Sequence, residues 1–308
     1  MHKPILYSLR KGIVDTEFFA SVFLAKSADK IQSIGKNEDE IVFLRSLAKP
    51  LQASILFDCN IIKDYKITES ELAIFSGSHT GTKKHCEIIK NLLKRLDLKL
   101  SDLKTEPIYP LDMRVLKKPS KLSNNCSGKH SMMLIMSKYS GADYNYLDVN
   151  HPIQQLIKKK QEELSGYKSD TLTFDGCGTP LWGLPYKNAI KAYFNLFHTE
   201  KYEKLIRSIL KHPDIFGGFK RTDSDIIKKS KGSLFSKTGA GGLLLIYNFK
   251  EDEILLIKMA HDDNFARELI AYNILNELGW LNFKPDMNIY NQKNNIAASY
   301  SFNPLVLK

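Results

Sequence analysis

Two apolar strands joined by a short polar turn, and the amphipathic helix that follows them, constrain the fold of this chain most. The segments 242–249 (GLLLIYNF) and 253–260 (EILLIKMA) are separated by three residues, which predicts an antiparallel hairpin. A helix is expected over 262–278, with Gly279 as its stop. Because strands and helices interleave in this way, we expect a layered α/β (α+β) fold with an antiparallel sheet flanked by helices. The inward face of the helix is expected to carry Phe265, Leu269, Ile270, Ile274 and Leu278.

The rest of the chain mixes helical and strand-like segments, without a repeat or a linker rich in Pro, Gly or Ser. The stretch 18–25 (FFASVFLA) predicts a strand. Thr68 and Glu71 have the spacing of a capping box, which marks the start of a helix. Residues 46–58 predict a helix with one apolar face, made by Leu47, Leu51 and Ile55. Further helices are expected over 82–96, 152–164, 187–197 and 199–210.

Composition excludes several classes of function. The chain has 308 residues, of which 43% are hydrophobic, and we expect one domain over 1–308. The formal net charge is +11, but the lysines are scattered along helices, as in 157–162 and 226–231. We interpret them as solvent-facing, since no aromatic–basic stripe or zinc-finger spacing accompanies them. The sequence therefore predicts no nucleic-acid partner.

No membrane segment is expected either. No apolar run approaches the roughly 18 residues that a membrane helix needs, and the N-terminus has no apolar signal region. The four cysteines are therefore expected to be reduced, in a cytoplasmic protein. We expect two of them, Cys59 and Cys86, to lie in the core; the other two are Cys126 and Cys177.

The first candidate catalytic pair is Ser46 and Lys49, an S-x-x-K spacing at the start of a predicted helix. Residues at i and i+3 share one helix face, so the lysine amine can reach the hydroxyl. A serine hydroxyl needs a base to act as a nucleophile, and a lysine kept neutral by burial can supply one. The same spacing also occurs by chance in many helices.

A second pair strengthens this interpretation. Lys237 begins a K-T-G sequence directly before an apolar strand. S-x-x-K and K-T-G are two of the three sequence marks of serine β-lactamases and penicillin-binding proteins; the third, S-D-N, is absent. Between them, the loop 76–81 (SGSHTG) offers Ser78 as a second hydroxyl near the nucleophile. The loop is also suited to cap the helix that follows, through Thr80 or Thr82.

Two turn-like stretches each hold one cysteine, 124–130 (NNCSGKH) and 175–180 (DGCGTP). Their thiolates, with one nitrogen ligand, would give zinc three protein ligands and an open position. His130 is the more orthodox nitrogen donor, since the amine of Lys129 must first lose a proton. Two other interpretations stay open: a pair of buried free thiols, or a nucleophilic cysteine beside a histidine.

Taken together, these stretches resemble the rhizobial-type, or class 3, L-asparaginases. The similarity runs in the same order from about Arg45 to about Arg267 and rests on the sequences RSLAKPLQ, SGSHTG with His85, NNCSGKHSMML, DGCGTPLWGLP and SKTGAGG. Members of this family hydrolyse L-asparagine to L-aspartate and ammonia. The resemblance implies a fold related to serine β-lactamases and glutaminases, and a homodimer.

The resemblance also assigns roles to single residues. It implies a first catalytic pair, Ser46 and Lys49, and a second, Ser78 and Lys237. It implies that zinc is bound by Cys126, Lys129 and Cys177, which replaces His130 by a lysine as third ligand. It places three further residues at the lining of the pocket, namely Arg45, His130 and Asp175.

Three departures from the family pattern concern substrate preference. The segment 16–21 (TEFFAS) lacks a nearby histidine, the region 102–110 lacks a cysteine–glycine pair, and Gly241 stands where the family has an acidic residue. We therefore expect asparagine hydrolysis through an acyl-enzyme formed by serine and lysine, with a zinc ion that positions the substrate. The alternatives are a penicillin-binding or β-lactamase-like serine hydrolase, and a catalytically retired metal-binding protein.

Overall fold

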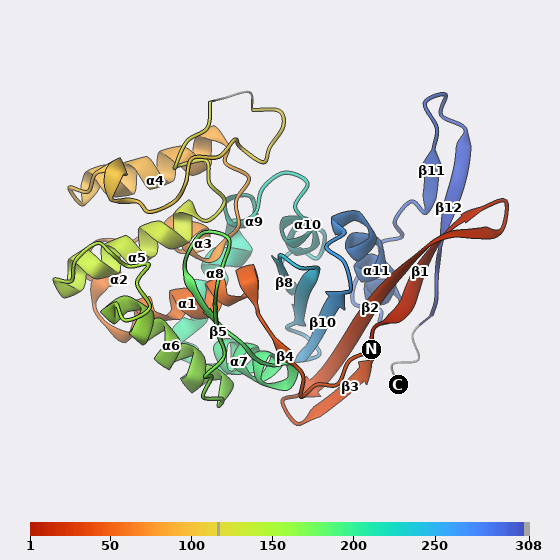
Figure 1. Ribbon diagram of the computed structural model, residues 1–308, viewed down its shortest axis with the longest axis horizontal. Coiled ribbons are helices and arrows are strands. Elements are labelled where there is room, and N and C mark those ends of the chain that lie inside the picture. The colour runs from red at the N-terminus through yellow and green to blue at the C-terminus, as the bar shows by residue number, and fades with distance from the viewer. Residues whose placement is uncertain (116–117, 305–308) are drawn as a thin grey trace.

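The structure is a computed structural model that describes residues 1–115 and 118–304. Figure 1 shows a long antiparallel sheet with a large group of helices on one side. In the described part, the sheet has the order β11-β12-β1-β2-β10-β9-β8, and β3 pairs with β2. Two short two-stranded sheets, β4-β7 and β5-β6, lie outside it. The strands are β1 (Lys3–Arg10), β2 (Ile13–Ser27), β3 (Lys30–Ile34), β4 (Ile41–Val42), β5 (Leu172–Phe174), β6 (Pro180–Trp182), β7 (Leu184–Pro185), β8 (Leu234–Gly239), β9 (Leu243–Asn248), β10 (Glu253–Met259), β11 (Asn288–Tyr290) and β12 (Ile296–Phe302).

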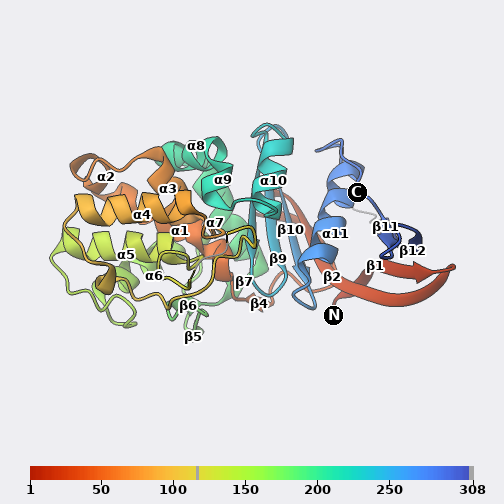
Figure 2. The same cartoon turned by 90° about the horizontal axis from the view of Figure 1, so that it is seen from above.

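The helices fall on both faces of the sheet. Figure 2 shows α11 on one face, and the other helices mostly on the opposite side. Four short 3₁₀ turns join them: η1 (Arg45–Leu47), η2 (Ser54–Asp58), η3 (Leu100–Asp102) and η4 (Glu200–Tyr202). The α-helices are α1 (Ala48–Ala53), α2 (Ile61–Asp64), α3 (Glu69–Ser76), α4 (Lys83–Arg95), α5 (Ser127–Ser140), α6 (Pro152–Ser165), α7 (Tyr186–His198), α8 (Glu203–Lys211), α9 (Pro213–Phe216), α10 (Thr222–Lys229) and α11 (Asn264–Glu277).

Two hydrophobic cores sandwich the sheet. Successive side chains of a strand point to opposite faces, so β10 supplies Leu256 to the core under the helical group and Leu255 to the core under α11. Both β9 and β10 are apolar on both faces for this reason. The central strands are therefore buried on both sides, and the layered fold expected from the sequence is confirmed.

Most of the predicted elements are present. Strands β9 and β10 form the expected hairpin, with Asn248 opposite Glu253, and α11 ends before Gly279, which has φ +69°. The capping box is formed, because Glu71 and Thr68 each bond the other's backbone N–H. The strand predicted at 18–25 is the middle of the longer β2. No helix within 1–115 and 118–304 is long and apolar enough to span a bilayer.

Four predictions about local structure are wrong in detail. The helix expected at 46–58 is split into η1, α1 and η2. Phe265 is 55% exposed, because it lies in the first turn of α11 at the mouth of a cavity rather than over the sheet. Lys160 is buried, since Asp58 and Glu163 both pair with its amine. Cys59 and Cys86, which the sequence placed in the core, are only half-buried. On α4 the inward position is taken by His85 instead of Cys86.

Candidate active site

The hydroxyl of Ser78 is the meeting point of two buried lysines. Ser78 follows the C-terminus of α3, and its Oγ accepts a hydrogen bond of 2.9 Å from Lys49 Nζ on α1. Lys237 Nζ, on the edge strand β8, lies 3.3 Å from the same oxygen. Lys49 also donates to the carbonyl oxygens of Gly77 (2.8 Å) and Asn125 (3.2 Å). Segments far apart in sequence therefore meet here: α1 and β8 bring amines to the Ser78 hydroxyl, and Asn125 holds one of these amines.

Two glycines of the motifs make this convergence possible. A Cβ on Gly77 would lie 2.1 Å from the carbonyl oxygen of Phe216, and a Cβ on Gly128 would lie 2.1 Å from that of Ile74. Any side chain at either position would push backbone apart, because real Cβ atoms do not approach oxygen so closely. The glycines thus let the SGSHTG and NNCSGKH segments pack directly against α9 and α3.

The environment of the two lysines lowers their affinity for a proton. Burial lowers the pKa of Lys49. Burial also lowers the pKa of Lys237, and the positive charges of Lys49 and Arg221 add to this effect, to give a pKa of about 7. The buried carboxylate of Asp223, 3.3 Å from Lys237 Nζ, acts in the opposite direction. A lysine with such a pKa can exchange a proton near neutral pH, as a general base must.

Ser46 lies one turn before Lys49 and is half-buried. It lines a cavity of about 140 Å³ together with Ser78. Among the described residues, however, Lys49 donates to Ser78 and not to Ser46. Arg45, which directly precedes Ser46, has φ +51°, an uncommon backbone conformation for a residue other than glycine. Its guanidinium holds the Asp175 carboxylate through a 2.7 Å hydrogen bond, which fixes this turn to the DGCGTP loop.

The two cysteine loops meet beside this centre. Lys129 Nζ donates to Cys177 Sγ at 3.1 Å and to Thr179 Oγ1 at 2.7 Å, and it lies 3.7 Å from Asp175 Oδ2. A hydrogen bond between the thiols of Cys126 and Cys177 contributes to their opposite pKa shifts. It raises the pKa of Cys126 and lowers that of Cys177.

The same cluster stabilises a charged lysine. Burial disfavours the ammonium form of Lys129, but the thiols of Cys177 and Cys126 and the Asp175 carboxylate outweigh burial and raise its pKa. His130 lies next to this group, and burial is the main cause of its lowered pKa. Its Nδ1 lies 3.2 Å from the Tyr146 hydroxyl.

The residues present fit a metal only in one way. Within the part of the chain that the structure describes, no three side chains of His, Cys, Asp or Glu are arranged to hold a metal ion. In the assignment made from the sequence, the Lys129 amine is the third ligand. The two sulfurs and this amine do lie together, as the assignment of Cys126, Lys129 and Cys177 requires.

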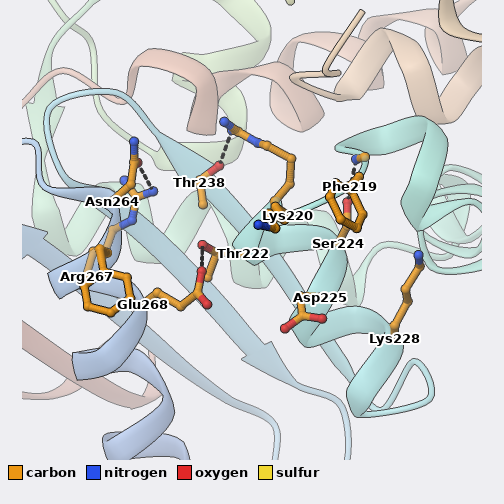
Figure 3. Close-up of a pocket in the computed structure, with 13 residues that line it drawn as sticks. Phe219, Lys220, Thr222, Ser224, Asp225, Lys228, Thr238, Asn264, Arg267 and Glu268 are labelled. Carbon is orange, nitrogen blue, oxygen red and sulfur yellow. Dashed lines mark hydrogen bonds between the residues drawn. The ribbon is translucent and has the colours of Figure 1, made fainter. Parts of the chain in front are cut away.

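Several residues at the cavity were not singled out from the sequence. Arg221 donates to Thr238 Oγ1 at 2.9 Å, and Arg267 donates to Asn264 Oδ1 at 2.6 Å, as Figure 3 shows for Arg267. Asp223 accepts a 2.8 Å hydrogen bond from Thr238 Oγ1. Burial disfavours its charge, yet Lys237 and Arg221 lower its pKa to about 2. The only sequence signal for Arg221 and Asp223 is the charged run 220–225, which leads into the first turn of α10, and Arg267 lies outside it.

The acidic residue missing after K-T-G-A is replaced from elsewhere in the chain. Asp262, at the start of the segment before α11, accepts hydrogen bonds from the backbone N–H groups of Gly241 (2.7 Å) and Gly242 (2.9 Å). It lines the smaller cavity and lies 3.7 Å from Arg267 Nη1. A carboxylate thus stands close to position 241 although the residue there is glycine.

The fold and this centre define a mixed α/β protein with a buried serine–lysine cluster at the edge of an antiparallel sheet. The model of the L-asparaginase II family matches residues 6–299, and the chain belongs to that family. A comparison with curated proteins gave no match.

Solved structures with a related arrangement are distant in sequence. A β-lactamase from Mycobacterium bovis is 12% identical, with a TM-score of 0.44 over 84% of this chain and 94% of that chain. A penicillin-binding protein from Bacillus halodurans is 11% identical, with a TM-score of 0.43 over 83% of this chain and 95% of that chain.

Proposed function

We propose that this protein hydrolyses the side-chain amide of L-asparagine, giving L-aspartate and ammonia through an acyl-enzyme. Membership of the L-asparaginase II family supports an amidohydrolase. The observation that carries the proposal is the Ser78 hydroxyl, held between the amines of Lys49 and Lys237 beside a small cavity that Ser46 also lines. Hydroxyls activated by buried amines are suited to nucleophilic attack on an amide carbon.

In the proposed reaction, Ser46 attacks the amide carbon and Lys49 takes its proton. The two side chains share one helical turn, and such contacts often tighten only when substrate is bound. Ser78 and Lys237 then pass a proton to the departing ammonia and later activate water. The pKa of about 7 for Lys237 suits both steps, because its amine can hold or release a proton at neutral pH.

The developing oxyanion needs hydrogen-bond donors fixed in advance. The N–H groups of Gly241 and Gly242 already bond Asp262. We therefore assign this role to the backbone N–H groups of Ser46 and Ala240, which both line the smaller cavity.

Zinc is part of the proposal, with Cys126, Lys129 and Cys177 as its ligands. When bound there, it would supply a fixed positive charge close to the substrate's α-amino and carboxylate ends. The residues around the zinc site would orient the α-amino and carboxylate groups of the substrate. Arg45 and Asp175 are paired at 2.7 Å, and His130 packs beside the thiols. The lysine must lose its proton to bind metal, so zinc affinity should fall as the pH falls.

We also propose a cytoplasmic homodimer. The four cysteines are free thiols, as expected in a reducing compartment. The arm formed by β1, β2, β11 and β12 extends away from the body in Figure 1. It exposes apolar side chains that a second copy could cover, namely Ile13, Val14, Tyr290 and Ile296. Light scattering on the purified protein tests this, and a monomer at micromolar concentration would refute the dimer.

Ammonia release from L-asparagine tests the central proposal, with L-glutamine as the comparison substrate. We expect hydrolysis of asparagine by the zinc-loaded protein and none by Ser46→Ala. Hydrolysis of the chromogenic β-lactam nitrocefin without release of ammonia would instead support the β-lactamase-like alternative. A protein that binds zinc and hydrolyses neither substrate would be the retired metal-binding protein, and the proposed function would be wrong.

A further inference from the structure

A second, larger cavity opens directly beside the candidate active site. Its volume is about 700 Å³, against about 140 Å³ for the cavity at Ser46 and Ser78. Figure 3 shows the side chains that surround it, from the segment before α10, from α10 itself and from the start of α11. The two cavities are adjacent, since four residues line both of them: Arg221, Thr238, Asn264 and Arg267. Free asparagine would occupy only a small part of this space.

At the boundary between the cavities, two guanidinium groups each keep one nitrogen, the Nε, without a hydrogen-bond partner among the described residues, although their other nitrogens bond Thr238 and Asn264. Arg267 is 3% exposed, and its Nε is buried without a hydrogen-bond partner. The Nε of Arg221 also makes no hydrogen bond, and its nearest carboxylate oxygen, on Asp223, lies 3.7 Å away. Asp223 is already shared with Lys237. Arg267 is buried and Arg221 is partly exposed, and a pair of guanidinium groups at one place is suited to bind a carboxylate.

Two aromatic side chains line the larger cavity, together with the charged side chains of Lys220, Asp225, Lys228 and Glu268. Phe219 is 46% exposed and Phe265 is 55% exposed, although both are large apolar side chains. Arg114 lies over the Phe219 ring, 3.5 Å from its centroid, and Tyr300 packs against Phe265 at 5.6 Å between ring centroids. The two rings are thus held in place while part of each faces the cavity. This arrangement favours a ligand with an apolar side chain next to its carboxylate.

The larger cavity lies on the leaving-group side of the scissile bond. In the proposed reaction, Ser78 and Lys237 deliver the proton to the departing nitrogen. Thr238, the next residue on β8, lines both cavities. Whatever is attached to the departing nitrogen would therefore extend past Thr238 toward Arg221 and Arg267.

We propose that this protein also hydrolyses secondary amides whose leaving group is an amino acid or a short peptide with an apolar side chain. The inference rests on the proposed function, because it uses the same serine centre. The bond between the acyl carbon and the substituted nitrogen breaks, and that nitrogen takes a proton through Ser78. Water then hydrolyses the acyl-enzyme, so the products are L-aspartate and the free amino acid. The carboxylate of the leaving group binds Arg221 and Arg267.

Two substrates that differ by one carboxylate test the inference. They are β-aspartyl-phenylalanine and N4-phenethyl-asparagine, which lacks the leaving-group carboxylate. We expect kcat/KM to be roughly ten- to hundredfold higher for the dipeptide, the range for a hydrogen bond to a charged group. If the protein hydrolyses asparagine but shows no preference for the dipeptide, the inference is wrong and the proposed function stands.

A variant and its control locate the effect. Arg221→Met should reduce the preference for the dipeptide to about one, since Arg221 is the more accessible of the two arginines. Arg207→Met, on α8 and outside both cavities, should keep the preference unchanged. If Arg221→Met keeps the full preference, the carboxylate is bound elsewhere and the inference fails.

If no substrate is hydrolysed, the proposed function and the inferred hydrolysis of secondary amides both fail. Calorimetry with the same two compounds on the wild-type protein then tests the carboxylate site on its own. Tighter binding of the dipeptide, abolished in Arg221→Met, would support the carboxylate site. Equal binding of both compounds would overturn it.

Discussion

Two buried clusters that contain lysine lie side by side in this protein, and the pKa values of their amines are shifted in opposite directions. Lys49 and Lys237 surround the Ser78 hydroxyl, whereas Lys129 lies among Cys126, Cys177 and Asp175. All three lysines are at most 2% exposed. Burial acts against the ammonium form in each case. The pKa nevertheless falls for Lys49 and Lys237 and rises for Lys129.

The difference comes from the neighbours of each amine and not from its depth. Lys237 has one carboxylate, Asp223, but that group is shared with Arg221, and Lys49 adds a second positive charge. Lys129 has two thiols and a carboxylate around it. One cluster is therefore built to exchange protons, and the other is built to hold a charge or, after deprotonation, a metal. Four predictions test this comparison, in order of decreasing effect.

The largest effect is expected from the hydroxyl that attacks. Ser46→Ala should lower kcat for asparagine by roughly 10⁴- to 10⁶-fold, the scale seen when a nucleophile is removed. The fold should persist, because Ser46 is half-buried and only one oxygen atom is lost. Ammonia release and circular dichroism check the two parts. If Ser46→Ala keeps most of its activity while Ser78→Ala does not, the attacking hydroxyl is Ser78, the one that both lysines contact.

Replacing the first lysine should be the next most damaging change. Lys49→Arg should reduce kcat roughly 10²- to 10⁴-fold, nearly as much as Lys49→Ala, since a guanidinium cannot act as a base. The pair of variants separates the charge of Lys49 from its ability to lose a proton. Substantial activity in the arginine variant would show that Lys49 supplies charge alone, and the proposed contrast with Lys129 would disappear.

The thiol cluster should affect binding more than turnover. Cys126→Ser and Cys177→Ser should each lose zinc, because a serine hydroxyl is a poor ligand at neutral pH, and KM should rise roughly tenfold or more. Cys59→Ser and Cys86→Ser are the controls and should keep close to one zinc per chain. Elemental analysis and steady-state kinetics provide the readouts. A loss confined to kcat would contradict a positioning role. If elemental analysis finds no metal in the purified wild-type protein, zinc is no part of the proposed function.

The sequence predicted the elements whose signal is local. Periodic apolar residues identified α11 and the hairpin β9–β10, and the capping box located the start of α3. The sequence similarity brought together Ser78, Lys237 and the two cysteine loops, because each lies in a long glycine-containing motif. These motifs can be recognised from the sequence because close backbone contacts require their glycines, as at Gly77 and Gly128.

The features that the sequence could not predict depend on contacts between distant single residues. Periodicity placed Phe265 inward, but the first turn of α11 borders a cavity that no local pattern reveals. Lys160 belonged to a charged run, and its burial depends on Asp58, about a hundred positions earlier, as well as on the nearby Glu163. Arg221 and Arg267 have no motif at all. The role proposed for them rests on their place in the lining of both cavities and on one nitrogen of each, the Nε, that has no partner in the described part of the chain.

The smallest expected effect concerns stability, and it compares two buried lysines directly. The pKa of Lys237 is lowered in the folded protein to about 7, from about 10.5 in an unfolded chain. Between these values the unfolded state binds more protons than the folded state, so this group makes the folded protein more stable as the pH rises from 7 toward 10.5. The pKa of Lys160 is raised instead, because Glu163, Asp58 and Tyr202 bond its amine and outweigh its burial. Its amine stays protonated in both states over this range.

Lys237→Met removes the titrating group and keeps the length of the side chain. We expect the variant to lose part of the wild-type gain in Tm between pH 6.5 and pH 9. With a folded-state pKa of about 7, this group contributes roughly 2–3 kcal/mol of stability between pH 6.5 and pH 9, so the difference should be roughly 5 °C. Asp223, with a pKa of about 2, stays ionised throughout and adds no pH dependence. Lys160→Met is the matched control, and its Tm difference from wild type should be the same at both pH values, as measured by calorimetry. If the two variants show the same pH dependence, Lys237 is protonated in the folded protein at neutral pH, and it cannot be the group that accepts the proton.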